Sequence, residues 1–206
     1  MTAILALARW TPRFAARSFA ELRMLKVGAE TSVGRLAGAV AGEMLKDQQV
    51  AMDACGPKAQ LTALKAVTQA STYLNLERPG MQVAVEPWPE RIAGHDQQPE
   101  TSAIRLHLTL VPEFLPKEAD VRMARETNPG EAAKEVAKFI RAKGAVTLAG
   151  MGQEPMSRAL KAMMMARAML GDDALGKGLV AAPSRQKSGE FYRMVLHCQL
   201  APSTRT

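Results

Sequence analysis

The chain has 206 residues, a length that allows one or two domains. Hydrophobic residues make up 47%, too many for an intrinsically disordered protein, yet no run of eighteen apolar residues is long enough to cross a membrane as a helix. Two cysteines, Cys55 and Cys198, exclude a disulfide framework and fit a reducing compartment. The formal net charge of +7 favours phosphate-bearing partners without identifying one.

Residues 1–20 differ in composition from the rest of the chain. They contain no acidic residue, and Arg9, Arg13 and Arg17 recur at four-residue spacing, which places them on one face of a helix. An arginine-rich, acid-free, amphipathic leader is typical of a mitochondrial or plastid transit peptide. We therefore expect a location in the mitochondrial matrix, with the plastid as the alternative. An amphipathic extension that docks on the protein body is the other interpretation.

The elements of the first half follow the order β-α-β-α-β-β. Apolar residues at helical spacing predict the helices, and short apolar or alternating runs predict the strands. In chain order the predicted elements are a strand at 25–29, a helix at 33–47, a strand at 50–55, a helix at 58–74, and strands at 81–86 and 103–111 joined by a polar loop at 87–102. Two helices over a four-stranded mixed sheet form a two-layer α/β sandwich.

The second half of the chain repeats the first. Residues 25–74 align with 121–170 without a gap at an offset of 96, and 14 of these 50 positions are identical. A shorter loop then reduces the offset to 90, which aligns His107 with His197. A shared composition rich in leucine and alanine would give scattered identities rather than one ungapped diagonal. We therefore predict two copies of one module, at residues 24–112 and 121–202, with a short linker between them.

Four short segments carry a resemblance to a known family: Leu25-Lys26-Val27, Ala37-Gly38-Ala39, Ala54-Cys55-Gly56 and Ala63-Leu64-Lys65-Ala66-Val67. In these segments the chain resembles the stage V sporulation protein S family, which is related in fold to the Alba chromatin and RNA-binding proteins. The resemblance is strong over 24–112 and weaker over 121–202. It implies two tandem Alba-like sandwiches that form an intramolecular pseudo-dimer. It also implies nucleic-acid binding by loop lysines and by the arms between the last two strands.

The turn before the second predicted helix is a candidate phosphate site. Gly56 lets the backbone approach a ligand, and the first N–H groups of the helix favour an anion. Lys58 lies in that first turn, where the helix dipole does not favour a cation, so a phosphate would explain it. A solvated lysine is the alternative. The second copy carries Glu154 at the matched position, which we expect to repel phosphate.

Other basic residues are candidates on three further surfaces. Lys26 alternates with apolar residues in the first strand, so we expect it to face away from the helices. Lys65 and Lys161 occupy matched positions on the second helix of each copy, where phosphate contact and a stem that covers apolar surface are both open. The remaining candidates are Lys134, Lys138 and Arg141 on the first helix of the second copy, and Arg91, Arg185 and Lys187 in the arms.

Two of these surfaces have a competing interpretation. Glu131 and Glu135 lie close to the lysines of the second copy, so that face is either a phosphate contact or a solvated charged surface. Trp88 lies between two prolines in the predicted loop, where packing against the protein body is preferred over stacking on a base. The aromatic content of 4% argues against base readout by stacking on an open sheet.

No arrangement typical of catalysis, a metal site or a cofactor is found in the sequence. The three histidines are scattered, and both cysteines are expected inside apolar strands as inert thiols. We therefore expect a protein that is not an enzyme and needs no cofactor or metal. We expect it to bind RNA, with ribosomal RNA as the preferred target, and to contact other proteins of a ribonucleoprotein such as the mitochondrial ribosome. We expect no contact with a membrane. The alternatives are a protein-binding scaffold and a DNA-binding nucleoid protein.

Overall fold

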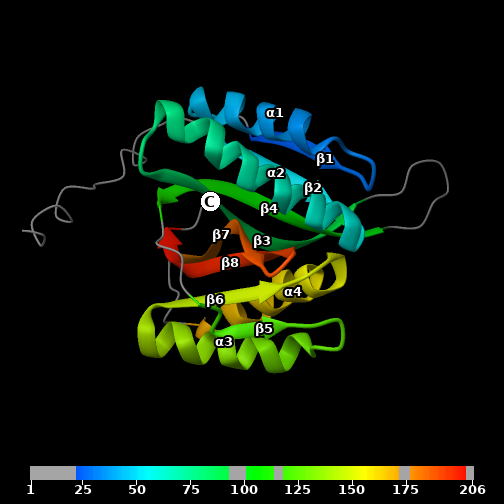
Figure 1. Ribbon diagram of the computed structural model, residues 1–206, viewed down its shortest axis with the longest axis vertical. Helices are drawn as coiled ribbons and strands as arrows, with labels where there is room; N and C mark the ends of the chain where they lie inside the picture. The colour runs from blue at the N-terminus through cyan, green and yellow to red at the C-terminus, as the bar shows by residue number, and fades with distance from the viewer. Residues whose placement is uncertain (1–21, 93–100, 114–117, 172–176, 203–206) are drawn as a thin grey trace, which may run out of the picture.

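The computed structural model describes residues 22–92, 101–113, 118–171 and 177–202 (Figure 1). The predicted leader at 1–20 lies outside these residues. The first half contains β1 (Arg23–Val27), α1 (Val33–Leu45), β2 (Val50–Ala54), α2 (Gly56–Glu77), β3 (Met81–Ile92) and β4 (Thr101–Pro112). The second half contains β5 (Val121–Met123), α3 (Pro129–Lys143), β6 (Ala145–Gly150), α4 (Gln153–Leu170), β7 (Lys177–Ser188) and β8 (Phe191–Pro202).

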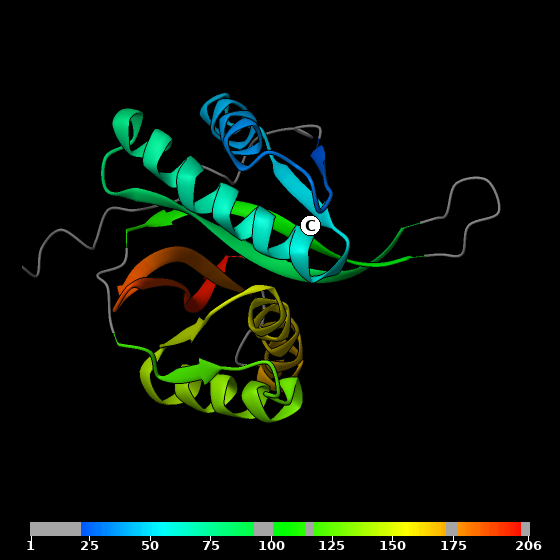
Figure 2. The same ribbon diagram turned by 45° about the vertical axis from the view of Figure 1, so that its right-hand side comes forward.

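The strands form one mixed sheet of eight, in the order β1-β2-β4-β3-β7-β8-β6-β5. In each half the outer pair is parallel and the other neighbours are antiparallel. The predicted mixed α/β class is confirmed. The halves meet at the centre, where Val85 of β3 pairs with Ala181 of β7. In both views α1 and α3 lie at opposite ends of the molecule, with the strands between them (Figure 1; Figure 2).

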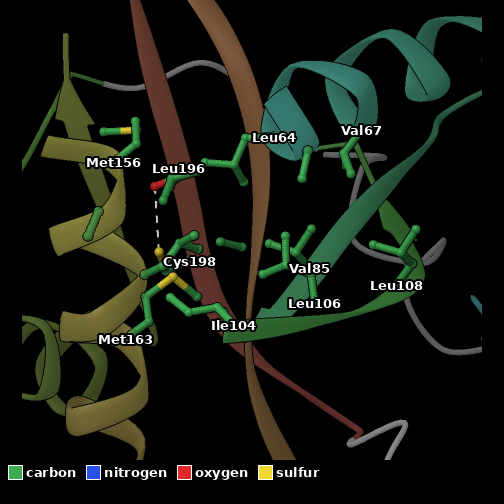
Figure 3. Packing of buried hydrophobic residues seen from close by; sticks show 14 of the residues in the cluster. Leu64, Val67, Val85, Ile104, Leu106, Leu108, Met156, Met163, Leu196 and Cys198 are labelled. Atoms are coloured by element: carbon green, nitrogen blue, oxygen red, sulfur yellow. Dashed lines mark hydrogen bonds between the residues drawn. The ribbon is translucent and has the colours of Figure 1, made fainter. Parts of the chain in front are cut away.

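One hydrophobic core runs through both halves. The helix α2 packs against α4 and β7, and α4 in turn packs against β3. Figure 3 shows Leu64 of α2 and Met163 of α4 on either side of strand residues such as Leu196 and Cys198, all of them almost completely buried. Because each long helix contacts a strand of the other half, the two sets of elements share their apolar surface rather than pack as separate bodies.

The two cysteines have different surroundings. Cys198 is buried, its thiol donates to the carbonyl oxygen of Leu196 at 3.6 Å, and burial raises the pKa of the thiol above its usual range, as expected for an inert cysteine. The prediction for Cys55 is wrong, because β2 ends at Ala54 and Cys55 is exposed as the N-cap of α2. The helix therefore begins earlier than expected, with Pro57 in its first turn, where the missing N–H costs nothing.

The central strands are longer than the hydrophobic pattern predicts. The predicted loop at 87–102 is wrong, since β3 continues to Ile92 and β4 begins at Thr101. Pro87 and Pro89 pair with Leu106 and Ile104 of β4. Proline is tolerated there because β3 pairs with β7 at Val85, and beyond that point its outer edge is unpaired within the described residues.

Side-chain capping accounts for the start of α3 but not for that of α1. Thr31 accepts a hydrogen bond from the backbone N–H of Gly28 through Oγ1 at 2.9 Å, and Ser32 is the N-cap of α1 without a side-chain bond. In α3 the Asn128 side chain accepts from the N–H groups of Gly130 and Glu131. Among the described residues no helix is long and apolar enough to cross a membrane.

Candidate nucleic-acid interface

The turn at the start of α2 places Lys58 against an acidic side chain. Gly56 has a φ of +79°, which glycine adopts at low cost, and Lys58 follows in the first turn. The Lys58 Nζ lies 2.5 Å from Oε1 of Glu30, and this hydrogen bond and charge lower the pKa of Glu30. Both side chains are more than half exposed, so the pair is held weakly. A phosphate at this turn would compete with Glu30 for the lysine.

The basic residues of α3 also have acidic or backbone partners. Lys134 lies 2.9 Å from Glu131, and Lys138 lies 3.5 Å from Glu135, each one turn away on the helix. Arg141 donates through Nη2 to the carbonyl oxygen of Met169 at 2.7 Å and so ties α3 to α4. The alternation of lysine and glutamate gives this face little net charge, as the solvated-surface interpretation expects.

The predicted basic residues of the first half are dispersed over different elements. Lys26 is exposed on β1, Lys65 is exposed on α2, and Arg91 is exposed near the end of β3. Lys161 occupies the same kind of position on α4. None of these four belongs to the lining of the pocket described below.

Acidic groups also lie beside Arg105 on the sheet of the first half. Arg105 of β4 donates to both carboxylate oxygens of Asp53, at 2.7 and 2.9 Å, and lies 2.9 Å from Glu90. The bond to Asp53 is the main reason why the pKa of Arg105 is raised. One guanidinium between two carboxylates leaves no excess of positive charge on this part of the sheet.

The β7–β8 arm combines basic and aromatic side chains. Arg185 and Lys187 are exposed on β7, and the Arg185 guanidinium carbon lies 4.7 Å from the centroid of the Tyr192 ring. Tyr192 is 57% exposed and its neighbour Phe191 is 64% exposed. Aromatic rings beside arginine and lysine can stack on bases while the cations contact phosphates. Sequence reasoning identified both cations but missed both rings, because it considered total aromatic content and not position on the arm.

A pocket lies beside this arm, where β5 and β6 end and α4 begins. Its volume is about 680 Å³, and its lining contains three arginines, Arg122, Arg125 and Arg193, together with Ser188 of the arm. Glu154 is the single acidic residue in the lining. Sequence reasoning missed all three arginines. Arg122 and Arg125 could have been found, because they flank the end of a predicted strand that precedes a helix, where anions are often bound.

Comparison with known protein families identifies the first half of the chain. The family model of stage V sporulation protein S matches residues 23–112. This half is similar to the stage V sporulation protein S family. The match ends with β4, at Pro112, and does not extend over the second half. No curated protein matches the chain.

The stage V sporulation protein S half is not the half with the most concentrated positive charge. Its Lys58 and Arg105 have carboxylate partners, whereas the arm and the pocket of the second half collect five cations with two acidic residues, Glu154 and Glu190. The stage V sporulation protein S family is not a known enzyme family. Within the residues that the structure describes, no group of three metal-ligating side chains is close enough to hold a metal ion.

Proposed function

We propose that this chain is an RNA-binding protein that contacts the phosphate backbone with little dependence on sequence. The observation that carries the proposal is that basic residues lie on both faces of the β7–β8 hairpin. Arg185 and Lys187 share one face with the exposed ring of Tyr192, and Arg193 lies on the other face, in the pocket with Arg122 and Arg125. Cations that lie on a strand arm and at strand ends can contact the phosphates of a single-stranded or irregular RNA more readily than those of a regular duplex. The rings add stacking, which tolerates any base.

The architecture that we propose is a pair of tandem Alba-like modules joined as an intramolecular pseudo-dimer. It is supported by the identical order of elements in the two halves and by the central β3–β7 pairing. The packing of α2 against α4 also fits an approximate twofold relation. Since the match to the stage V sporulation protein S family covers only the first half, the second half would be a diverged copy that has taken over most of the nucleic-acid contact.

The cellular setting that we propose is a ribonucleoprotein of the mitochondrial matrix, such as the mitochondrial ribosome. The basic, acid-free residues 1–20 support this location, and a plastid is the alternative. The test is to locate the full chain and a chain lacking residues 1–20 by fluorescence, and to sediment organelle extracts with and without RNase. A cytosolic full-length protein, or sedimentation that RNase does not change, would contradict this setting.

Filter binding tests RNA contact directly. We expect Arg185→Glu/Lys187→Glu to weaken binding of a single-stranded RNA by at least tenfold. The matched control is Lys134→Glu/Lys138→Glu, which reverses the same number of charges on a surface where both lysines already have glutamate partners, and we expect a smaller loss. A duplex DNA competitor of equal length distinguishes RNA binding from a nucleoid role. If neither variant changes affinity while circular dichroism remains that of the wild type, RNA binding by this surface is wrong.

The second candidate function is a protein-binding scaffold without nucleic-acid contact. The ion pairs of Lys58, Lys134 and Lys138 favour it, because they leave these predicted phosphate ligands with acidic neighbours. The scaffold makes a different prediction for salt. Its association with partners would vary little between low and moderate ionic strength, whereas RNA binding through several phosphates would fall steeply.

A further inference from the structure

The pocket beside the arm is built by strand ends that converge from three directions. β5 and β6 are parallel, and they end at Met123 and Gly150. β8 runs antiparallel to β6, with Gly150 opposite Met194, so the next step of the register brings Arg193 beside the chain that leaves β6. The carboxyl ends of parallel strands are where open α/β sheets bind ligands. Arg122 of β5, Arg193 of β8 and Arg125 of the following loop meet at this edge.

The arginines of the pocket are not neutralised by the protein. Arg122 and Arg125 are exposed and have no hydrogen-bond or ion-pair partner in the ranges that the structure describes. Arg193 donates through Nη2 to Oε1 of Gln186 at 3.0 Å, while its Nε is buried without an acceptor among the described residues. A buried donor that lacks an acceptor is unfavourable unless a ligand or water supplies one. With Glu154 as the single acid, the lining carries a formal charge of +2.

The floor of the pocket is closely packed backbone at Gly150 and the start of α4. A Cβ atom at Gly150 would lie 2.7 Å from Cε of Met156 and 3.0 Å from the carbonyl oxygen of Met123, so only glycine fits between these groups. The N-cap of α4, Gly152, has a φ of +92° and offers no side chain to its helix. The first N–H groups of α4 are thus not capped by a side chain, in contrast to those of α3, which Asn128 caps. They add partial positive charge to a site that the arginines already define.

The corresponding turn of the first half has fewer unpartnered cations. At the offset of 96 residues, Lys26, Ala29 and Lys58 occupy the positions of Arg122, Arg125 and Glu154. Lys26 is exposed without a partner among the described residues, no cation replaces Arg125, and Lys58 is bonded to Glu30. The first half therefore has one unpartnered cation at these positions, whereas the second half has two. The expectation that Glu154 would make the second turn repel phosphate did not include these arginines, which are distant in sequence from each other and from the turn.

We propose that this pocket binds a phosphate monoester, supplied either by a mononucleotide or by the terminal phosphate of an RNA strand. Guanidinium groups present paired N–H donors that match phosphate oxygens, and a lining of +2 balances the two charges of a monoester better than the single charge of a phosphodiester. The volume of about 680 Å³ is that of a small-molecule site. The RNA source rests on the proposed function, whereas the mononucleotide source does not.

Isothermal titration of the full chain tests the inference, with adenosine 5′-monophosphate and adenosine as the probes. We expect the monophosphate to bind and adenosine to bind at least tenfold more weakly. The variant Arg122→Gln/Arg125→Gln should weaken monophosphate binding by at least tenfold, and it should fold normally because both side chains are exposed. Lys46→Gln, which removes a charge from α1 in the first half, is the control and should bind as the wild type does.

A second experiment compares one RNA oligonucleotide with a 5′-phosphate and with a 5′-hydroxyl. A preference for the phosphorylated strand that disappears in Arg122→Gln/Arg125→Gln assigns the strand end as the source. Binding of the monophosphate with equal affinity for the two strands assigns the mononucleotide. The inference would be overturned if the monophosphate bound no better than adenosine and the 5′-phosphorylated strand bound no better than the 5′-hydroxyl strand. In that case RNA binding that still depends on Arg185 and Lys187 would leave the proposed function standing. Conversely, a protein that binds the monophosphate but not RNA would contradict the proposed function and leave the pocket as a mononucleotide site.

Discussion

The guanidinium carbon of Arg167 lies 3.6 Å from the centroid of the Trp88 ring, which joins α4 of one half to β3 of the other. The Nε of Arg167 also lies 3.7 Å from Oε1 of Glu86, whose side chain is completely buried. Trp88, predicted to lie in a loop, is therefore a half-buried strand residue packed against the protein body. Because both contacts cross between halves, they help to fix how the two halves pack.

Removal of Arg167 should destabilise the protein. In Arg167→Ala a cation–π contact is lost and a buried carboxylate loses a cation, for which we expect about 2–4 kcal/mol of lost unfolding free energy. Urea unfolding followed by circular dichroism measures it. Lys161→Ala, an exposed position on the same helix, should change the stability by less than about 0.5 kcal/mol. Equal stabilities of the two variants would show that the Glu86–Arg167–Trp88 contact does not hold the halves together.

Gly178 should not accept a side chain. A Cβ atom there would overlap the Glu86 carboxylate, and Glu86 has no room to move because its side chain is completely buried. We expect Gly178→Ala to cost about 1–3 kcal/mol of stability. Gly38→Ala is the matched change, since a Cβ atom at Gly38 in the middle of α1 meets nothing within 4 Å. It should stabilise the protein by about 0.5–1 kcal/mol, and thermal unfolding of both variants checks the opposite signs.

The Glu30–Lys58 pair provides a pH-dependent test of the first turn. Since the folded-state pKa of Glu30 is lowered by Lys58, the pair contributes stability above the unfolded pKa of this carboxyl and loses it as the pH falls through the folded pKa. In Lys58→Gln the pKa of Glu30 should rise toward its usual value, as NMR titration of the carboxyl can show. RNA that draws Lys58 away should cause the same rise, whereas an unchanged pKa at saturating RNA would place Lys58 outside the interface.

The rings and the cations of the arm should respond differently to salt. We expect Tyr192→Ala to weaken binding of single-stranded RNA by about 1–3 kcal/mol per stacked base, with the slope of log affinity against log salt unchanged. Lys187→Gln should instead reduce that slope by about 0.7, since one phosphate contact is lost. Filter binding across a salt series separates the two effects. A reduced slope in Tyr192→Ala would indicate that the ring acts only by positioning Arg185.

The sequence by itself determined the order of the elements and most of their bounds. Hydrophobic periodicity is a local property, so α1, β2 and the start of β3 follow directly from it. It failed at Pro87 and Pro89, where an unpaired strand edge tolerates residues that usually end a strand. The segments between Leu25 and Val67 were also sufficient to indicate the family of the first half.

Only the tertiary structure decided which charges meet. Lys58 and Glu30 are 28 residues apart, and Arg193 lies some 70 residues beyond Arg122, yet sheet register and strand ends bring each set together. The same holds for Arg167 and Trp88, which belong to different halves. The periodicity of a single strand or helix tells which face a side chain occupies, but its neighbours depend on how strands pair and where each one ends. For that reason the second turn, predicted to repel phosphate, became a pocket lined by three arginines.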